Sequence, residues 1–75
     1  MSYPTIDVIA TGKKINLIRK SRGIKVVDIA DYMGFSNTNS IYKWLRGETM
    51  PSLDNIYALS ILLDVTINDI IVACS

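Results

Sequence analysis

The sequence predicts an all-α fold, a compact five-helix bundle that occupies the whole chain. The chain has 75 residues, which is enough for one hydrophobic core. Its composition is 49% hydrophobic and 20% charged, a balance that favours a folded domain over a disordered tail. Apolar residues recur in short blocks at helical spacing, and glycine or proline separates the blocks. We therefore expect one domain over residues 1–75, with its core at about 9–72, and no strand.

The first two helices are predicted over residues 7–21 and 25–33. The first has a cationic end and stops before Gly23, a residue type that commonly ends helices. The second carries apolar residues at the i, i+3, i+4, i+7 spacing of one helical face. These residues are Val26, Ile29, Ala30 and Met33. Gly34 then ends the second helix.

Three shorter helices are predicted toward the C-terminus. The third follows a cap at Ser36 and ends at Gly47, and the fourth is capped by Ser52. The fifth opens at Thr66 in a capping-box arrangement and runs through Val72. The expected apolar face of the fourth helix comprises Leu53, Ile56, Tyr57, Leu59 and residues 61–63.

The residue inventory excludes several classes of chemistry. The chain has no histidine and one cysteine, Cys74, which excludes a four-ligand zinc site, a Ser/His/Asp relay and an intrachain disulfide. It also lacks a phosphate-cradling glycine motif and paired carboxylates, so we do not expect an enzyme. The N-terminal residues do not form a signal peptide, and the apolar stretch at 61–73 is too interrupted to span a bilayer. We expect a cytoplasmic protein without a metal, cofactor, small-molecule ligand or membrane partner.

The charges are divided along the chain, although the net charge is only +1. Residues 1–47 hold all eight basic residues and three acidic ones, a net charge of +5. Residues 48–75 hold four acidic residues and no basic one, a net charge of −4. The basic segment is suited to tracking phosphates.

The second and third predicted helices form a helix-turn-helix around Gly34. A close crossing of two helices needs a small residue at the contact and a glycine where the chain turns through left-handed geometry. Ala30 and Gly34 meet these two requirements. The expected apolar seam between the helices comprises Ile29, Met33, Phe35, Ile41 and Trp44.

The third predicted helix leaves polar residues facing outward. If Ile41, Trp44 and Leu45 face the core, helical spacing puts five polar residues on the opposite side. They are Thr38, Asn39, Tyr42, Lys43 and Arg46. This face has no carboxylate, and its groups can donate hydrogen bonds to base edges or phosphate oxygens. We expect Lys43 and Arg46 to contact DNA, whereas base contact and a plain surface position stay equally open for Asn37 and Ser40.

Three pairs of runs share their order and spacing with one known family. They are Gly12–Ile15 with Arg19–Ile24, Gly34–Ser36 with Ile41–Gly47, and Pro51–Ser52 with Leu63–Ile71. Over about residues 9–72 the chain resembles the phage-repressor or Cro-type helix-turn-helix family, also called the xenobiotic-response-element family. The resemblance implies a lambda-repressor-like five-helix domain that binds double-stranded DNA with its third helix in the major groove, often as a dimer on a two-fold symmetric operator.

The resemblance also implies which residues contact DNA. They are Lys25, Asn37, Thr38, Asn39, Tyr42, Lys43 and Arg46. The second helix departs from the family at its start, where the family usually has Ser or Thr followed by a polar residue. Lys25 can still contact a phosphate as a point charge, whereas Val26 has no side-chain donor.

Two functions from different classes follow from these observations. The first is a sequence-specific transcriptional regulator of bacterial or phage type, which we expect to form a homodimer through its C-terminal helices. The second is an antitoxin-like or adaptor module that keeps the scaffold but binds DNA weakly or not at all. In either case an apolar patch near the C-terminus could provide the contact with a partner, and the alternative is that the same residues close the core. It would comprise Ile67, Ile70, Ile71 and Val72.

Overall fold

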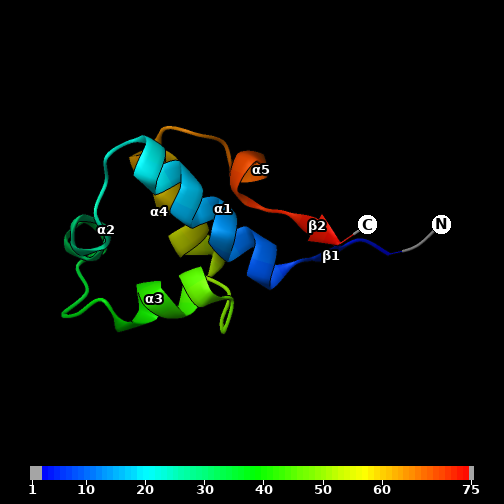
Figure 1. Ribbon diagram of the computed structural model, residues 1–75, viewed down its shortest axis with the longest axis horizontal. Coiled ribbons are helices and arrows are strands. Elements are labelled where there is room, and N and C mark those ends of the chain that lie inside the picture. Colours follow the sequence, from blue (N-terminus) through cyan, green and yellow to red (C-terminus); the bar gives the residue numbers. More distant parts are fainter. Residues whose placement is uncertain (1–2, 75) are drawn as a thin grey trace.

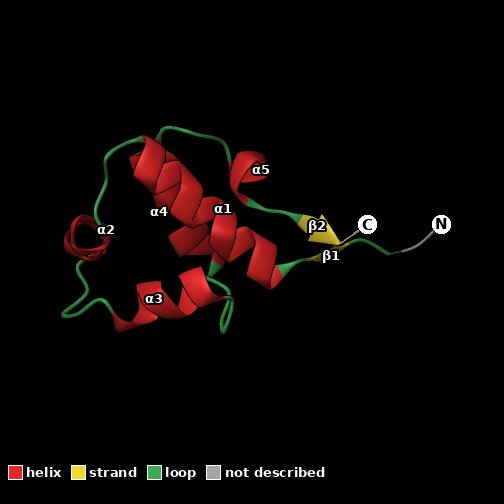
Figure 2. Ribbon diagram, in the orientation of Figure 1, coloured by secondary structure: helices red, strands yellow, loops and turns green. Residues whose placement is uncertain are grey.

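Five helices follow one another in residues 3–74, the part of the chain that the computed structural model describes. They are α1 (Val8–Ser21), α2 (Val26–Met33), α3 (Asn39–Arg46), α4 (Leu53–Leu63) and α5 (Ile67–Ile70). The predicted five-helix architecture is confirmed, and Figure 2 shows that helices make up most of the regular structure. None of these helices is both long and apolar enough to cross a membrane.

The expectation of no strand is wrong at the two ends of the described chain. Strands β1 (Thr5–Ile6) and β2 (Ala73–Cys74) pair in antiparallel fashion, with Thr5 opposite Cys74. Figure 1 shows this two-stranded ribbon at one end of the molecule, where the N- and C-terminal segments lie side by side. The ribbon thus pairs the segment before α1 with the segment after α5.

The last helix is shorter than predicted, and this difference explains the ribbon. α5 ends at Ile70, and Ile71 already has extended backbone angles. Val72 is held by α1 instead: its N–H donates to the Thr11 hydroxyl at 3.0 Å, and its carbonyl accepts from the Asp7 N–H at 2.8 Å. These hydrogen bonds draw the β-branched run out of the helix, and that run is locally prone to extended geometry.

Of the two alternatives for the C-terminal apolar residues, the structure supports closure of the core over an exposed patch. Ile70 is completely buried, while Ile67 and Ile71 are partly buried against the core. Val72 is half-buried at the junction with α1. α5 contacts both α1 and α4, so its apolar residues close the core and leave no patch of their own.

The helix ends follow mostly local rules. Asp7 caps α1 by accepting from the Ala10 N–H at 2.9 Å, and Ser52 caps α4 by accepting from the Asn55 N–H at 3.2 Å. Thr66 caps α5 by accepting from the backbone N–H three residues on, as predicted. Each cap satisfies an N–H group that has no partner within its helix.

The predicted cap of α3 is wrong. α3 begins at Asn39 with Thr38 as its cap residue, later than a cap at Ser36 would place it. The Asn37 side chain explains the delay, because its Oδ1 accepts from the Asn39 N–H at 3.0 Å. Such a local side-chain bond competes with the helical ladder and holds the preceding residues in a loop.

The core contains side chains from all five helices. Its buried apolar residues are Ile15, Val26, Ile29, Ala30, Ile41, Trp44, Ile56, Leu59, Leu63 and Ile70. The predicted seam between α2 and α3 is confirmed, and Phe35 meets Trp44 edge to face with ring centroids 5.9 Å apart. Edge-to-face aromatic pairs add to the stability that burial provides.

The predicted apolar face of α4 is only partly correct. Ile56, Leu59 and Leu63 are buried, as expected. Leu53, Tyr57 and Ile61 are exposed, at 76%, 61% and 57%. These three follow i, i+4, i+8 spacing, so they form one row on the outer side of the helix. We call this row the α4 stripe.

Candidate nucleic-acid interface

Two glycines set the position of α3 against α1. Gly12 is buried inside α1, and a Cβ atom built on it would lie 2.2 Å from the Trp44 carbonyl oxygen. Gly47 follows α3 with a φ of 75°, and a Cβ there would lie 2.7 Å from the Ile9 Cα. Only residues without a side chain allow this backbone contact. The C-terminal half of α3 is therefore seated directly on α1.

Sequence reasoning missed this role of Gly12. It expected Ala30 to provide the small residue that orients α3, and Ala30 is indeed buried in the core. The tight backbone approach at Gly12 is nevertheless between α1 and α3. The usable signal was the placement of Gly12 in the interior of a helical pattern, where glycine is unfavourable unless packing requires it.

The turn between α2 and α3 has the predicted geometry. Gly34 adopts the left-handed conformation with a φ of 74°. Its N–H donates to the Asp31 carbonyl at 3.2 Å, and the Phe35 N–H donates to the Ala30 carbonyl at 2.9 Å. These bonds satisfy carbonyls at the end of α2 and start the turn toward α3.

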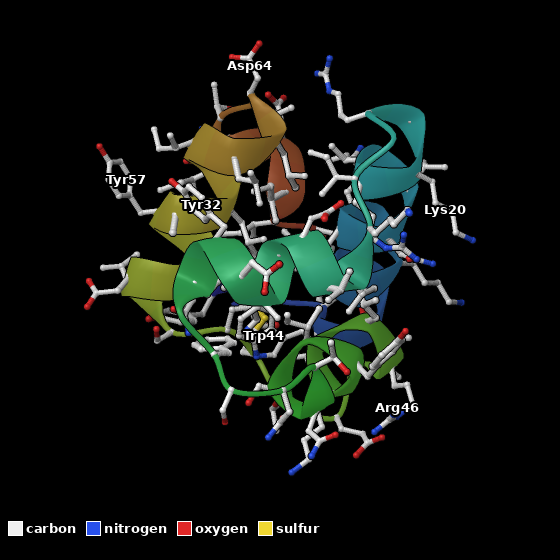
Figure 3. All side chains as sticks on the ribbon, turned by 90° about the vertical axis from the view of Figure 1, so that its left-hand side faces the viewer. Lys20, Tyr32, Trp44, Arg46, Tyr57 and Asp64 are labelled. Atoms are coloured by element: carbon white, nitrogen blue, oxygen red, sulfur yellow. The ribbon has the colours of Figure 1, made fainter. Side chains whose placement is uncertain are left out.

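The outward face of α3 carries four exposed side chains in one row. Asn39, Tyr42, Lys43 and Arg46 occupy i, i+3, i+4 and i+7 and are all exposed. Ile41 and Trp44 lie on the opposite side of the helix and are buried. Figure 3 shows Trp44 in the interior and Arg46 at the edge of the molecule. We call these four exposed residues the α3 row.

The remaining expected site residues lie outside this row. Thr38 is half-buried as the cap residue of α3, and the exposed Asn37 uses its side-chain oxygen on the Asn39 N–H. Lys25 is exposed and lies immediately before α2, the first helix of the helix-turn-helix. Its backbone N–H donates to Asp28 Oδ2 at 3.0 Å.

A carboxylate that sequence reasoning did not place at this face lies beside Arg46. The Arg46 Nε–H donates to Glu48 Oε2, and the two side chains form an ion pair. This hydrogen bond lowers the pKa of the Glu48 carboxyl below its ordinary value, and the charge of Lys43 lowers it further. The same bond raises the pKa of Arg46. Because Gly47 reverses the chain, a residue after α3 can reach back to the last turn.

The basic residues of α1, together with Arg22 just after its end, extend the positive surface. Lys13, Lys14, Lys20 and Arg22 are exposed, while Arg19 is half-buried with an Nη1 donating to the Ile24 carbonyl at 3.3 Å. Figure 3 shows Lys20 of α1 and Tyr57 of α4 on opposite sides, and Asp64 at the end opposite Arg46. Two acidic residues of the 48–75 segment nevertheless lie near these cations, since Glu48 pairs with Arg46 and the charge of Lys14 lowers the pKa of Asp69.

The two helices, their left-handed turn and the polar row on the second helix define a helix-turn-helix DNA-binding domain. A family model described as helix-turn-helix matches residues 15–70 of the chain. The protein therefore belongs to the Cro/C1-type helix-turn-helix family of DNA-binding transcription regulators, as its resemblance implied.

The fold is also similar to a solved structure. The restriction-modification controller protein C.AhdI from Aeromonas hydrophila superposes with a TM-score of 0.76 at 23% sequence identity. The similarity covers 85% of this chain and 96% of that chain. At this identity the likeness shows a shared fold. A comparison with curated proteins gave no match.

Proposed function

We propose that this protein regulates transcription by binding a specific double-stranded DNA sequence with α3 in the major groove. The observation that carries the proposal is the α3 row, which presents an amide, a phenol and two cations on a rigidly seated helix. Asn suits the donor and acceptor pair of adenine, and Arg or Lys suits the two acceptors of guanine. This combination of groups provides direct base readout.

The distribution of charge supports this mode of binding. Residues 1–47 carry a net charge of +5, and their cations lie on α1, before α2 and on α3. Residues 48–75 carry −4 and include all of α4 and α5. DNA repels the acidic part and attracts the basic part, so the field orients the domain with α3 toward the duplex.

The α4 stripe supports a homodimer. It is an exposed row of large apolar side chains on the acidic part of the molecule, and burying it against its own copy removes apolar area from water on both subunits. A two-fold axis makes the same stripe contact itself, as an isologous interface requires. Two α3 helices in such a dimer would read half-sites about 34 Å apart. A homodimer through the C-terminal helices would thus use α4, because the apolar residues of α5 are buried in the core.

Selection of bound genomic fragments, followed by titration of one selected duplex, tests the function. We expect the recovered fragments to share a two-fold symmetric sequence. We also expect the logarithm of the binding constant to fall linearly with the logarithm of the salt concentration, with a slope of about −0.9 for each phosphate contacted. Failure to recover any shared sequence, or an affinity that does not change with ionic strength, would contradict it.

The second candidate function is a protein-interaction module without DNA binding, and the same α4 stripe is the observation that favours it. The two functions differ in one measurement, because such a module gives no DNA complex even at low salt. A monomeric wild-type protein in light scattering, combined with absence of a DNA complex, would favour the module.

A further inference from the structure

Arg46 of the α3 row is already paired in the free protein with Glu48, a residue that the proposed function does not use. Both side chains are about half exposed, at 56% and 50%. Exposed ion pairs contribute little to folding stability, because solvent screens them and both side chains lose freedom. Stability alone therefore gives a weak reason for this pair.

The backbone after α3 fixes the position of Glu48. The Gly47 N–H donates to the Trp44 carbonyl at 3.0 Å, and the Glu48 N–H donates to the Lys43 carbonyl at 2.9 Å. Gly47 is in turn pressed against Ile9 of α1. Glu48 is thus anchored through its backbone beside the last turn of α3, and its carboxylate has a short reach to Arg46.

The geometry of the pair leaves the far edge of the guanidinium open. A guanidinium has five N–H donors in a planar fork, and the pair uses the Nε–H. Within residues 3–74, no hydrogen bond uses the two Nη groups of Arg46. Two Nη donors side by side match the O6 and N7 acceptors of guanine. A carboxylate on Nε restricts the rotation of the fork and so reduces the entropy lost when the fork binds.

We propose that Glu48 is a positioning residue that holds Arg46 by its Nε and directs the two Nη groups at a guanine in the major groove. This inference rests on the proposed function and adds to it a residue outside α3 that determines sequence preference. A guanine at the operator position that faces the C-terminal turn of α3 is its chemical counterpart.

Removal of Glu48 has different expected effects on DNA binding if Glu48 positions Arg46 and if it acts only as a negative charge. An acidic side chain near DNA repels phosphates, so removal of Glu48 acting only as a charge would tighten binding to every duplex. Removal of a positioning residue instead lowers the preference for the operator over a duplex in which the guanine is replaced. The measured quantity is therefore the ratio of the two affinities.

The test uses the full chain and two duplexes, measured by fluorescence anisotropy. One duplex is an operator obtained by selection. In the other, one guanine of that operator is replaced. This guanine is identified as the one whose replacement lowers the affinity of the wild type but not the affinity of Arg46→Ala. For Glu48→Ala we expect the ratio to fall about five- to tenfold, within the range of one bidentate base contact. Glu48→Gln keeps an oxygen acceptor for Nε and should restore part of the ratio.

Two controls separate positioning from charge and from folding. Asp54→Ala removes an exposed carboxylate from the first turn of α4, in the same acidic segment, and should leave the ratio unchanged. In the Arg46→Ala background, Glu48→Ala should lower the ratio no further, because the two residues act as one unit. Circular dichroism of each variant reports whether the helical fold is kept.

Two results would overturn the inference. If the wild type binds its operator and Glu48→Ala keeps the wild-type ratio, the positioning role is wrong while the proposed function stands. If the wild type forms no sequence-preferring complex, the proposed function and this inference are both wrong.

Discussion

Two glycines determine how α3 lies against α1. Gly12 and Gly47 bring α1 and the end of α3 into backbone contact. The position of Gly12 inside a helical pattern indicates that packing requires a glycine there, but it does not reveal which segment the glycine contacts. The exposed and buried sides of α3 were predictable, since helical periodicity depends on neighbours a few positions away. The pairing of Glu48 with Arg46 was not, because it depends on the left-handed turn at Gly47.

Replacing Gly12 with Ala tests the backbone contact. In an ordinary helix interior this change stabilises by about 1 kcal/mol. Here the added Cβ would lie 2.2 Å from the Trp44 carbonyl oxygen, so α1 and α3 must separate. We expect net destabilisation of about 1–3 kcal/mol, the usual cost of overpacking, measured by denaturant unfolding.

Lys13→Ala is the matched control for Gly12→Ala. Lys13 is the next residue of α1 and is exposed, so its replacement should change the free energy of unfolding by no more than about 0.5 kcal/mol. A Gly12→Ala variant that is as stable as the wild type would show that α1 and α3 do not approach this closely.

At the scale of elements, local signals predicted the helices and long-range contacts changed their ends. The caps at Ser52 and Thr66 and the stop at Gly34 act within a few residues, so the sequence reveals them. The exit of Val72 from the last helix depends on Thr11, which lies 61 positions away. Similarly, the buried side of α4 depends on where the neighbouring helices pack, so a helix with apolar residues on several sides could not be oriented from its sequence.

Thr11→Val tests how the ribbon is joined to α1. Valine keeps the shape of the buried threonine but removes the acceptor of the Val72 N–H. An unpaired N–H in a partly buried site costs about 1–3 kcal/mol. We expect a loss of stability of this size in denaturant unfolding and faster hydrogen exchange at Val72.

Thr11→Ser provides the matched control, because serine keeps the hydroxyl acceptor. It should preserve the slow exchange of the Val72 N–H even if the lost methyl group lowers overall stability. Equal exchange rates at Val72 in Thr11→Val and in the wild type would rule out this role of the hydroxyl.

At the scale of the whole molecule, the net charge of +1 conceals two regions of the sequence with opposite net charge. The basic region contains the helix-turn-helix, and the acidic region contains the α4 stripe. In the proposed function, this arrangement assigns DNA binding and self-association to different parts of one small domain. Composition alone gave no indication of a nucleic-acid partner, whereas the order of the charges along the chain did.

Ile61→Glu tests self-association through the α4 stripe. Ile61 is 57% exposed, so the variant should keep its fold, but two copies of the new carboxylate would face a buried apolar contact. We expect the variant to sediment as a monomer and to bind the operator more weakly than the wild type. Leu17→Glu changes a similarly exposed apolar residue of α1 and should remain dimeric. A wild type that is monomeric at tens of micromolar, or an Ile61→Glu variant that is still dimeric, would contradict the proposed dimer.

The central claim is that α3 reads base edges. The most direct measurement compares wild type, Arg46→Ala and Lys25→Ala against a selected operator and all of its single base-pair substitutions. We expect Arg46→Ala to lose about 1–3 kcal/mol and to become indifferent to the base at one position in each half-site. Lys25→Ala should weaken binding to every duplex alike and reduce the salt slope by about one. If Arg46→Ala also weakened every duplex alike and kept the full base preference, α3 would not be reading the sequence.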